Sequence, residues 1–154
     1  PARFDENDLA KLNASLVSET DFETIKDRFA ADIAEFGVAN VAALWVLVRE
    51  NLGKTSDFRE WITIAFDDVN TSVSDDDKPY IVDAIACLPD GDIKDQTWGV
   101  WTGELKIRTG RKGKSLFMPL RQAITGRSHG PDMGKFITIL GREKLEARLM
   151  SAVS

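Results

Sequence analysis

Apolar side chains recur at spacings of three and four residues along almost all of this sequence, the period that an amphipathic helix requires. No stretch alternates apolar and polar residues for more than two periods, as a half-buried strand would. The sequence therefore predicts an all-α fold without a sheet. The expected helices cover about residues 6–16, 22–36, 40–52, 58–65, 78–88, 95–108, 115–125, 131–140 and 142–152.

Local signals support several of these helix ends. Asp5 is a good N-cap for the first helix, and Thr20 with Glu23 has the spacing of a capping box for the second. Gly37 and Gly141 are expected to end helices, because glycine readily adopts the conformation that follows a last helical turn. Pro119 should kink its helix or mark its first turn.

A polar and acidic stretch, Asp67–Asp77, interrupts the helical pattern and is the expected boundary between two packed helical subdomains. We assign residues 1–70 to the first subdomain and residues 71–154 to the second. With 43% apolar and 29% charged residues, the composition is ordinary for a globular protein. One cysteine cannot form an internal disulfide, and we expect a cytoplasmic protein. Because the sequence opens on Pro1, we expect it to be part of a longer polypeptide.

Charge is distributed unevenly along the chain. The net charge is −5, yet residues 1–70 carry −7 and residues 71–154 carry +2. A run without any acidic residue contains seven basic ones: Lys106, Arg108, Arg111, Lys112, Lys114, Arg121 and Arg127. A local basic field of this kind attracts a polyanion whatever the total charge. The interleaved glycines would let the backbone approach phosphate closely.

Other chemistry finds less support in the residues. Gly113-Lys114-Ser115 resembles the end of a phosphate-binding P-loop, but Arg108 stands where the first glycine is needed. His129 is the only histidine, and no nucleophile signature accompanies it, so we expect a loop contact and not a general base. Trp98 and Trp101 could stack on bases, although their helical spacing favours a place in the core. The alternative to nucleic acid is a helical protein-interaction module whose basic face binds a protein partner.

The order of motifs near the C-terminus resembles that of bacterial glutamyl-tRNA synthetases. The stretch 109–114 leads into 117–126, followed by 129–131, 140–143 and 148–149, which read TGRKGK, FMPLRQAITG, HGP, LGRE and RL. Upstream, Ala2 to Asn13 is similar to the start of the anticodon-binding region of that family. The resemblance covers nearly the whole chain and is most specific at residues 109–149.

The resemblance implies stacked helical subdomains that grip the anticodon loop of glutamate tRNA. The catalytic domain of the family lies N-terminal to this region, and its HIGH- and KMSKS-type signatures are absent from this sequence. We therefore expect no catalytic residue, no metal and no cofactor in this chain, and no activity without the rest of the enzyme. The parent enzyme would be a monomeric ligase that joins glutamate to tRNA with ATP and magnesium.

Matched residue by residue, the family's base-contacting arginine falls on Arg121. The loop that holds anticodon bases falls on Gly130, Pro131 and Met133. The remaining basic residues of the run, Lys106, Arg108, Arg111, Lys112, Lys114 and Arg127, are expected to contact phosphates. Many members sense the last anticodon letter with an arginine where this sequence has Asn51, so we expect glutamine tRNA as a second partner.

Overall fold

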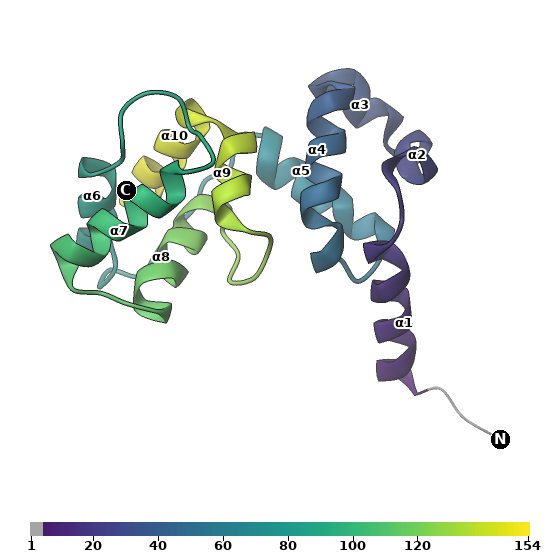
Figure 1. The fold of residues 1–154 in the computed structure, drawn as a ribbon, viewed down its shortest axis with the longest axis horizontal. Coiled ribbons are helices and arrows are strands. Elements are labelled where there is room, and N and C mark those ends of the chain that lie inside the picture. The colour runs from purple at the N-terminus through teal and green to yellow at the C-terminus, as the bar shows by residue number, and fades with distance from the viewer. Residues whose placement is uncertain (1–4) are drawn as a thin grey trace. The chain divides into compact units, whose positions relative to one another are not determined.

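The computed structural model describes residues 5–154, and in that part of the chain all regular structure is helical, so the all-α prediction is confirmed. Residues 2–4, where the family resemblance begins, lie outside the described residues. The chain separates after Asp67 into two compact units. The α-helices, labelled in Figure 1, are α1 Glu6–Ser18, α2 Phe22–Ile25, α3 Ala30–Phe36, α4 Val38–Val48, α5 Phe58–Phe66, α6 Lys78–Ala86, α7 Thr97–Thr109, α8 Lys114–Thr125, α9 Met133–Leu140 and α10 Arg142–Ala152. The short 3₁₀ helices of the first unit are η1 Lys26–Phe29, η2 Arg49–Asn51 and η3 Thr55–Asp57.

An aromatic cluster forms the core of the first unit. Phe58 of α5 meets Phe29 and Trp45 edge to face, each at a centroid distance of 5.0 Å. The indole N–H of Trp45 donates to the Thr20 carbonyl at 2.9 Å, which ties α4 to the start of α2. Burial of these rings stabilises the unit.

Two local expectations in this unit need correction. The helix expected over 22–36 is interrupted by the 3₁₀ turn η1, which brings Phe29 against Phe58. The capping box is not formed, because the Thr20 hydroxyl donates back to the Leu16 carbonyl at 2.6 Å. By contrast, Asp5 caps α1 as expected, accepting from the Asp8 amide at 2.8 Å.

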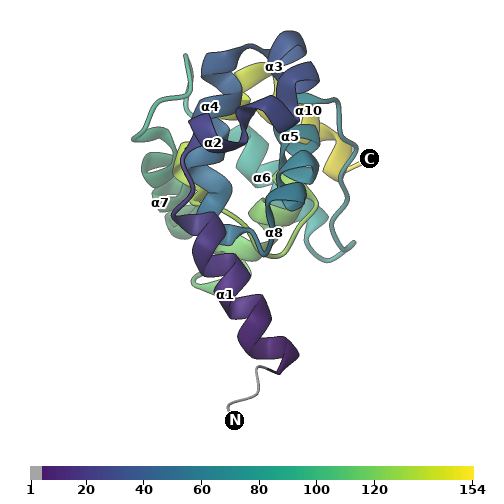
Figure 2. The same cartoon turned by 90° about the vertical axis from the view of Figure 1, so that its right-hand side faces the viewer.

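The apolar stripe of α1 is exposed in the described chain. Leu9, Leu12 and Leu16 are 52%, 45% and 57% exposed, while Val17 is buried. In Figure 2 the first turns of α1 extend away from the other helices of the unit.

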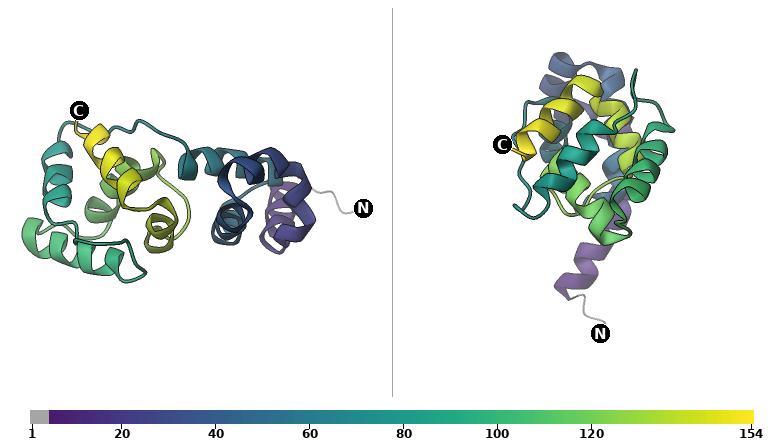
Figure 3. Two further views of the ribbon diagram at one scale, coloured as in Figure 1. Left: turned by 90° about the horizontal axis from the view of Figure 1, so that it is seen from above. Right: turned by 90° about the vertical axis from the view of Figure 1, so that its left-hand side faces the viewer.

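The second unit is a bundle of α6 to α10. α10 packs against α6, α8 and α9, and α7 packs against α6, α8 and α9 (Figure 3). Trp101 is fully buried and donates to the Ala84 carbonyl at 2.8 Å, which joins α7 to α6. Within residues 5–154 no helix combines the length and the apolar composition that a bilayer crossing needs.

Candidate nucleic-acid interface

Helix α8 and the loops at its two ends carry most of the residues that the sequence singled out. The helix begins after Gly113 and ends at Gly126, whose φ of 74° is the left-handed conformation of a helix C-terminus. At 1.5 Å per residue its 12 residues span about 18 Å. The basic loop 110–113 therefore lies at one end of α8 and the loop 126–132 at the other, with Arg121 between them.

Pro119 lies inside α8 and removes one of its hydrogen bonds. A proline has no N–H, so the Ser115 carbonyl four residues earlier loses its usual helical donor. The Arg111 guanidinium replaces it, donating to that carbonyl at 3.0 Å. The same nitrogen lies 2.8 Å from the Asp77 carboxylate, at side chains that are 27% and 24% exposed. Arg111 therefore supplies the hydrogen bond to the Ser115 carbonyl that the proline cannot make.

Tyr80 is a third partner of the Arg111 guanidinium, beside Asp77 and the Ser115 carbonyl. The Arg111 guanidinium carbon lies 4.3 Å from the ring centroid of Tyr80, a cation–π geometry. The Tyr80 hydroxyl donates to the Leu116 carbonyl at 2.7 Å, and burial raises the pKa of that hydroxyl. Arg111, which the sequence assigned to phosphate contact, thus has its guanidinium engaged with Asp77, Ser115 and Tyr80.

The other basic residues differ in how much they are engaged. Arg108 faces Asp83 at 3.4 Å, with both side chains nearly half exposed. Lys106, Lys112 and Lys114 are exposed on the end of α7, the loop and the start of α8. Arg127 is also exposed, just after α8. The N-terminus of α8 adds a partial positive charge beside the basic loop 110–113.

Arg121 and the loop 130–133 meet in the structure. The guanidinium donates to the Pro131 carbonyl at 3.1 Å, and this is its one side-chain hydrogen bond to the described residues. Burial lowers the pKa of Arg121, and the nearby Asp132 carboxylate acts in the opposite direction. Asp132 is itself fixed, because it caps α9 by accepting from the Lys135 amide at 3.0 Å. An anchored arginine with further N–H groups available suits recognition of a base edge.

The loop beside Arg121 is closely packed. Pro131 is buried and Met133, the first residue of α9, is 4% exposed. A Cβ atom on Gly134 would lie 3.3 Å from an Asp132 carboxylate oxygen and 3.4 Å from the Trp98 Cβ. The Met133 side chain therefore supports the loop from within, and the loop's outer surface is formed by residues such as Asp132.

An aromatic pair lies next to this loop: Trp98, for which the sequence favoured a place in the core over base stacking, and Phe117, which the sequence did not single out. Trp101 is in the core, as expected, but Trp98 is only half-buried and stacks on Phe117 at a centroid distance of 6.3 Å. Phe117 is 44% exposed. Its place four residues before Arg121, on the same face of α8, is the sequence signal that could have pointed to it.

Hydrogen bonds from α10 and from the 67–77 segment support the C-terminal end of α8. The Thr71 hydroxyl lies within hydrogen-bonding distance of the Ala123 carbonyl, at 2.6 Å, and Arg148 donates to the Ile124 carbonyl at 3.0 Å. Burial lowers the pKa of Arg148 to about 10, against the opposing effect of Asp68. Such buried donors satisfy the free carbonyls of a helix end and fix the direction of the loop that follows.

Asn51 belongs to the first unit, at the end of η2, where it is exposed. Arg49, two residues earlier, is 27% exposed; its guanidinium donates to the Thr20 carbonyl at 3.1 Å and lies 3.8 Å from Asp21. Arg49 is thus tied to the start of α2, whereas the Asn51 side chain faces solvent.

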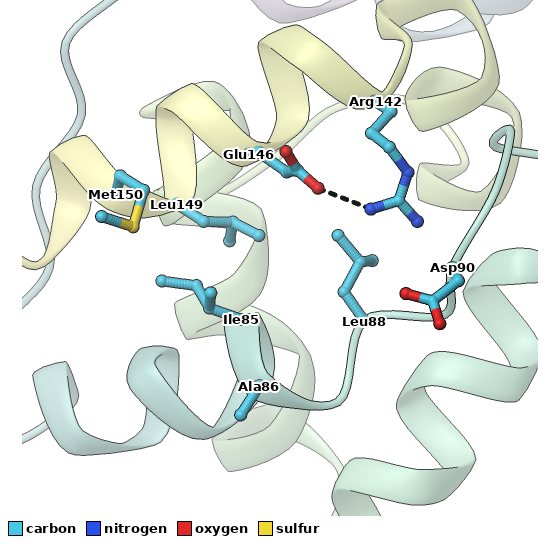
Figure 4. Close-up of a pocket in the computed structure, with 8 residues that line it drawn as sticks. All are labelled: Ile85, Ala86, Leu88, Asp90, Arg142, Glu146, Leu149 and Met150. Atoms are coloured by element: carbon cyan, nitrogen blue, oxygen red, sulfur yellow. Dashed lines mark hydrogen bonds and ion pairs between the residues drawn. The ribbon is translucent and has the colours of Figure 1, made fainter.

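A separate pocket of about 350 Å³ lies between α6 and α10 (Figure 4). Its lining is partly apolar and consists of Ile85, Ala86, Leu88, Asp90, Arg142, Glu146, Leu149 and Met150. The Arg142 guanidinium is engaged by the Glu146 carboxylate and by the carbonyls of Pro89 and Gly91. The arginine therefore holds the 89–91 turn against α10.

A sequence profile of the anticodon binding domain matches residues 28–153 of the chain. The chain belongs to this family. It is 44% identical to glutamate–tRNA ligase 2 of Bartonella tribocorum, over 96% of this chain and 32% of the relative. It is 41% identical to glutamate–tRNA ligase 2 of Hyphomonas neptunium, over 97% of this chain and 33% of the relative. The resemblance to glutamyl-tRNA synthetases is confirmed.

Solved structures agree at the level of the fold. The crystal structure of a glutamate tRNA ligase from Elizabethkingia meningosepticum aligns with a TM-score of 0.76, at 18% identity, over 99% of this chain and 33% of that one. A glutamate–tRNA synthetase from Elizabethkingia anophelis gives 0.74, at 19% identity. This anticodon-binding chain thus spans about a third of the length of the relatives that it matches.

Proposed function

We propose that this chain is the anticodon-binding part of a glutamate–tRNA ligase and holds the anticodon loop of glutamate tRNA. The observation that carries the proposal is the Arg121–Pro131 hydrogen bond, which joins a half-buried arginine to the loop 130–133 in a chain of the anticodon binding domain family. Unpaired bases are read at their edges by anchored donors of this kind. Glutamate activation with ATP and magnesium is assigned to the part of the ligase that this chain does not cover.

Within this proposal the basic residues have separate roles. Lys106, Lys112 and Lys114, with Arg108 and Arg127, contact phosphates, while Arg111 shapes the loop that presents the lysines. Arg121 gives base preference together with the loop that contains Gly130 and Pro131, and the buried Met133 supports that loop from within. Each of the two units acts as a helical anticodon-binding subdomain of a cytoplasmic, monomeric ligase. The alternative, a protein-interaction module, is not favoured, because the family match covers residues 28–153.

Titration of the chain with glutamate tRNA and with an anticodon-swapped transcript tests the proposal. We expect tighter binding of the native anticodon. Replacing Arg121 with alanine should cost about 1–3 kcal/mol for the native transcript, if the contact is a bidentate base contact, and much less for the swapped one. Lys94→Ala removes one exposed positive charge of the same unit and serves as the control. An unchanged anticodon preference in Arg121→Ala would refute the assignment.

A second proposal concerns the last anticodon letter, cytosine in glutamate tRNA and guanine in the matching glutamine tRNA. We propose that Asn51 accommodates both, because its amide has both a donor and an acceptor and lacks the bulk and charge of an arginine. The exposure of Asn51 and the engagement of Arg49 with Thr20 and Asp21 support this. The full-length ligase would then also charge glutamine tRNA with glutamate.

Charging of both tRNAs by the full-length ligase tests this second proposal. Asn51→Arg should increase the preference for glutamate tRNA, whereas Asn70→Arg, also at an exposed asparagine, should not. A preference of the unaltered ligase above roughly a hundredfold, about 2.7 kcal/mol, would exclude the proposed tolerance.

A further inference from the structure

We propose that Trp98 and Phe117 form a stacking platform for one unpaired base of the anticodon loop, adjacent to the base that Arg121 contacts. This inference rests on the proposed function and adds to it a base-binding position that the family resemblance did not indicate. The platform is built from α7 and α8 of the second unit.

The position of Phe117 on α8 is the first argument. Phe117 and Arg121 are four residues apart, so they lie one turn apart on the same face, with a rise of about 6 Å. Arg121 is anchored to the Pro131 carbonyl at 3.1 Å. A nucleotide next to the one held by Arg121 would therefore have an aromatic ring within reach.

The support behind the ring is the second argument. Trp98 stacks on Phe117 with an interplanar angle of 29° and a centroid distance of 6.3 Å. Trp98 is held in turn by the fully buried Trp101, edge to face at 5.7 Å. It also packs beside Gly134, where the absence of a side chain lets α7 approach the start of α9. A ring supported in this way is preorganised for stacking.

The exposure of Phe117 is the third argument. A phenylalanine that only covered Trp98 would be expected to bury its own ring, yet Phe117 is 44% exposed. Other exposed apolar residues of the unit, such as Ile107 at 82%, offer no aromatic surface. Lys114 at the start of α8 and Arg121 in its second half provide positive charge on either side of Phe117. Such charge suits a nucleotide better than an apolar partner.

The test uses the 154-residue chain and the anticodon stem-loop of glutamate tRNA with 2-aminopurine placed in turn at each loop position. Stacking on an aromatic ring quenches this base, so we expect bound-state quenching centred on one position. Phe117→Ala should abolish the quenching and weaken binding by about five- to 150-fold, the range that base–aromatic stacking covers. Phe117→Tyr should preserve both, and Ile107→Ala should change neither.

The outcomes separate this inference from the proposed function. If fluorescence anisotropy detects no binding of the stem-loop, both are refuted. If the stem-loop binds with its anticodon preference but quenching is absent, or persists in a folded Phe117→Ala chain, the platform alone is refuted. Thermal unfolding of each variant establishes that it is folded.

Discussion

Replacing Arg111 with alanine removes three interactions that hold the start of α8. The hydrogen bond to the Ser115 carbonyl and the partly exposed ion pair with Asp77 should each contribute about 0.5–1.5 kcal/mol. The contact with the Tyr80 ring should add about 0.5–1 kcal/mol. We therefore expect Arg111→Ala to lower the free energy of unfolding by about 1.5–4 kcal/mol in urea denaturation.

A double-mutant cycle with Pro119→Ala tests whether Arg111 stabilises α8 by replacing the amide donor that the proline lacks. An alanine at 119 restores an amide that can donate to the Ser115 carbonyl, so losing Arg111 should then cost about 1 kcal/mol less. The cost of removing the buried proline ring cancels in the cycle. Arg108→Ala, whose partner is Asp83, should show no coupling to position 119. A coupling below about 0.3 kcal/mol for Arg111 would refute the compensation argument.

Three further predictions follow from single positions. Lys112→Ala should weaken binding of all RNAs similarly and reduce the slope of log affinity against log salt by about 1. Gly126→Ala should destabilise the chain by about 1 kcal/mol because its φ is 74°, whereas Gly99→Ala, in open space within α7, should stabilise it by about 0.5–1 kcal/mol, both measured by urea denaturation. Burial raises the pKa of the Cys87 thiol, so the folded chain holds less thiolate at pH 8 than the unfolded chain. Alkylation of Cys87 should therefore be slower in the folded chain than in the chain unfolded in urea, and equal rates would contradict this.

The helices could be predicted from sequence because their signals are local. The Asp5 cap and the apolar period of three and four lie within one or two helical turns. The interruption at η1 could not be predicted, since it depends on the contact between Phe29 and Phe58, residues 29 positions apart. Local pattern does not encode which partner a buried ring will meet.

In the candidate site, too, the contacts between residues distant in sequence could not be predicted. Arg121 and Pro131 were selected by family resemblance, and nothing in their spacing reveals the hydrogen bond between them. The role of Arg111 depends on Asp77, 34 residues earlier, so from sequence it was indistinguishable from its basic neighbours. Phe117 lies in an apolar segment, a pattern that predicts a core residue, and only the structure shows that its side chain is 44% exposed.

In α8 a guanidinium performs the task of a backbone amide hydrogen, and that substitution makes part of the helix responsive to ionic strength. An amide–carbonyl bond is indifferent to salt, but the ion pair that orients Arg111 is about a quarter exposed and is partly screened as salt rises. Added salt would therefore both compete for phosphates and loosen the loop that presents Lys112 and Lys114. Circular dichroism of the RNA-free chain across a salt series measures the second contribution separately from the first.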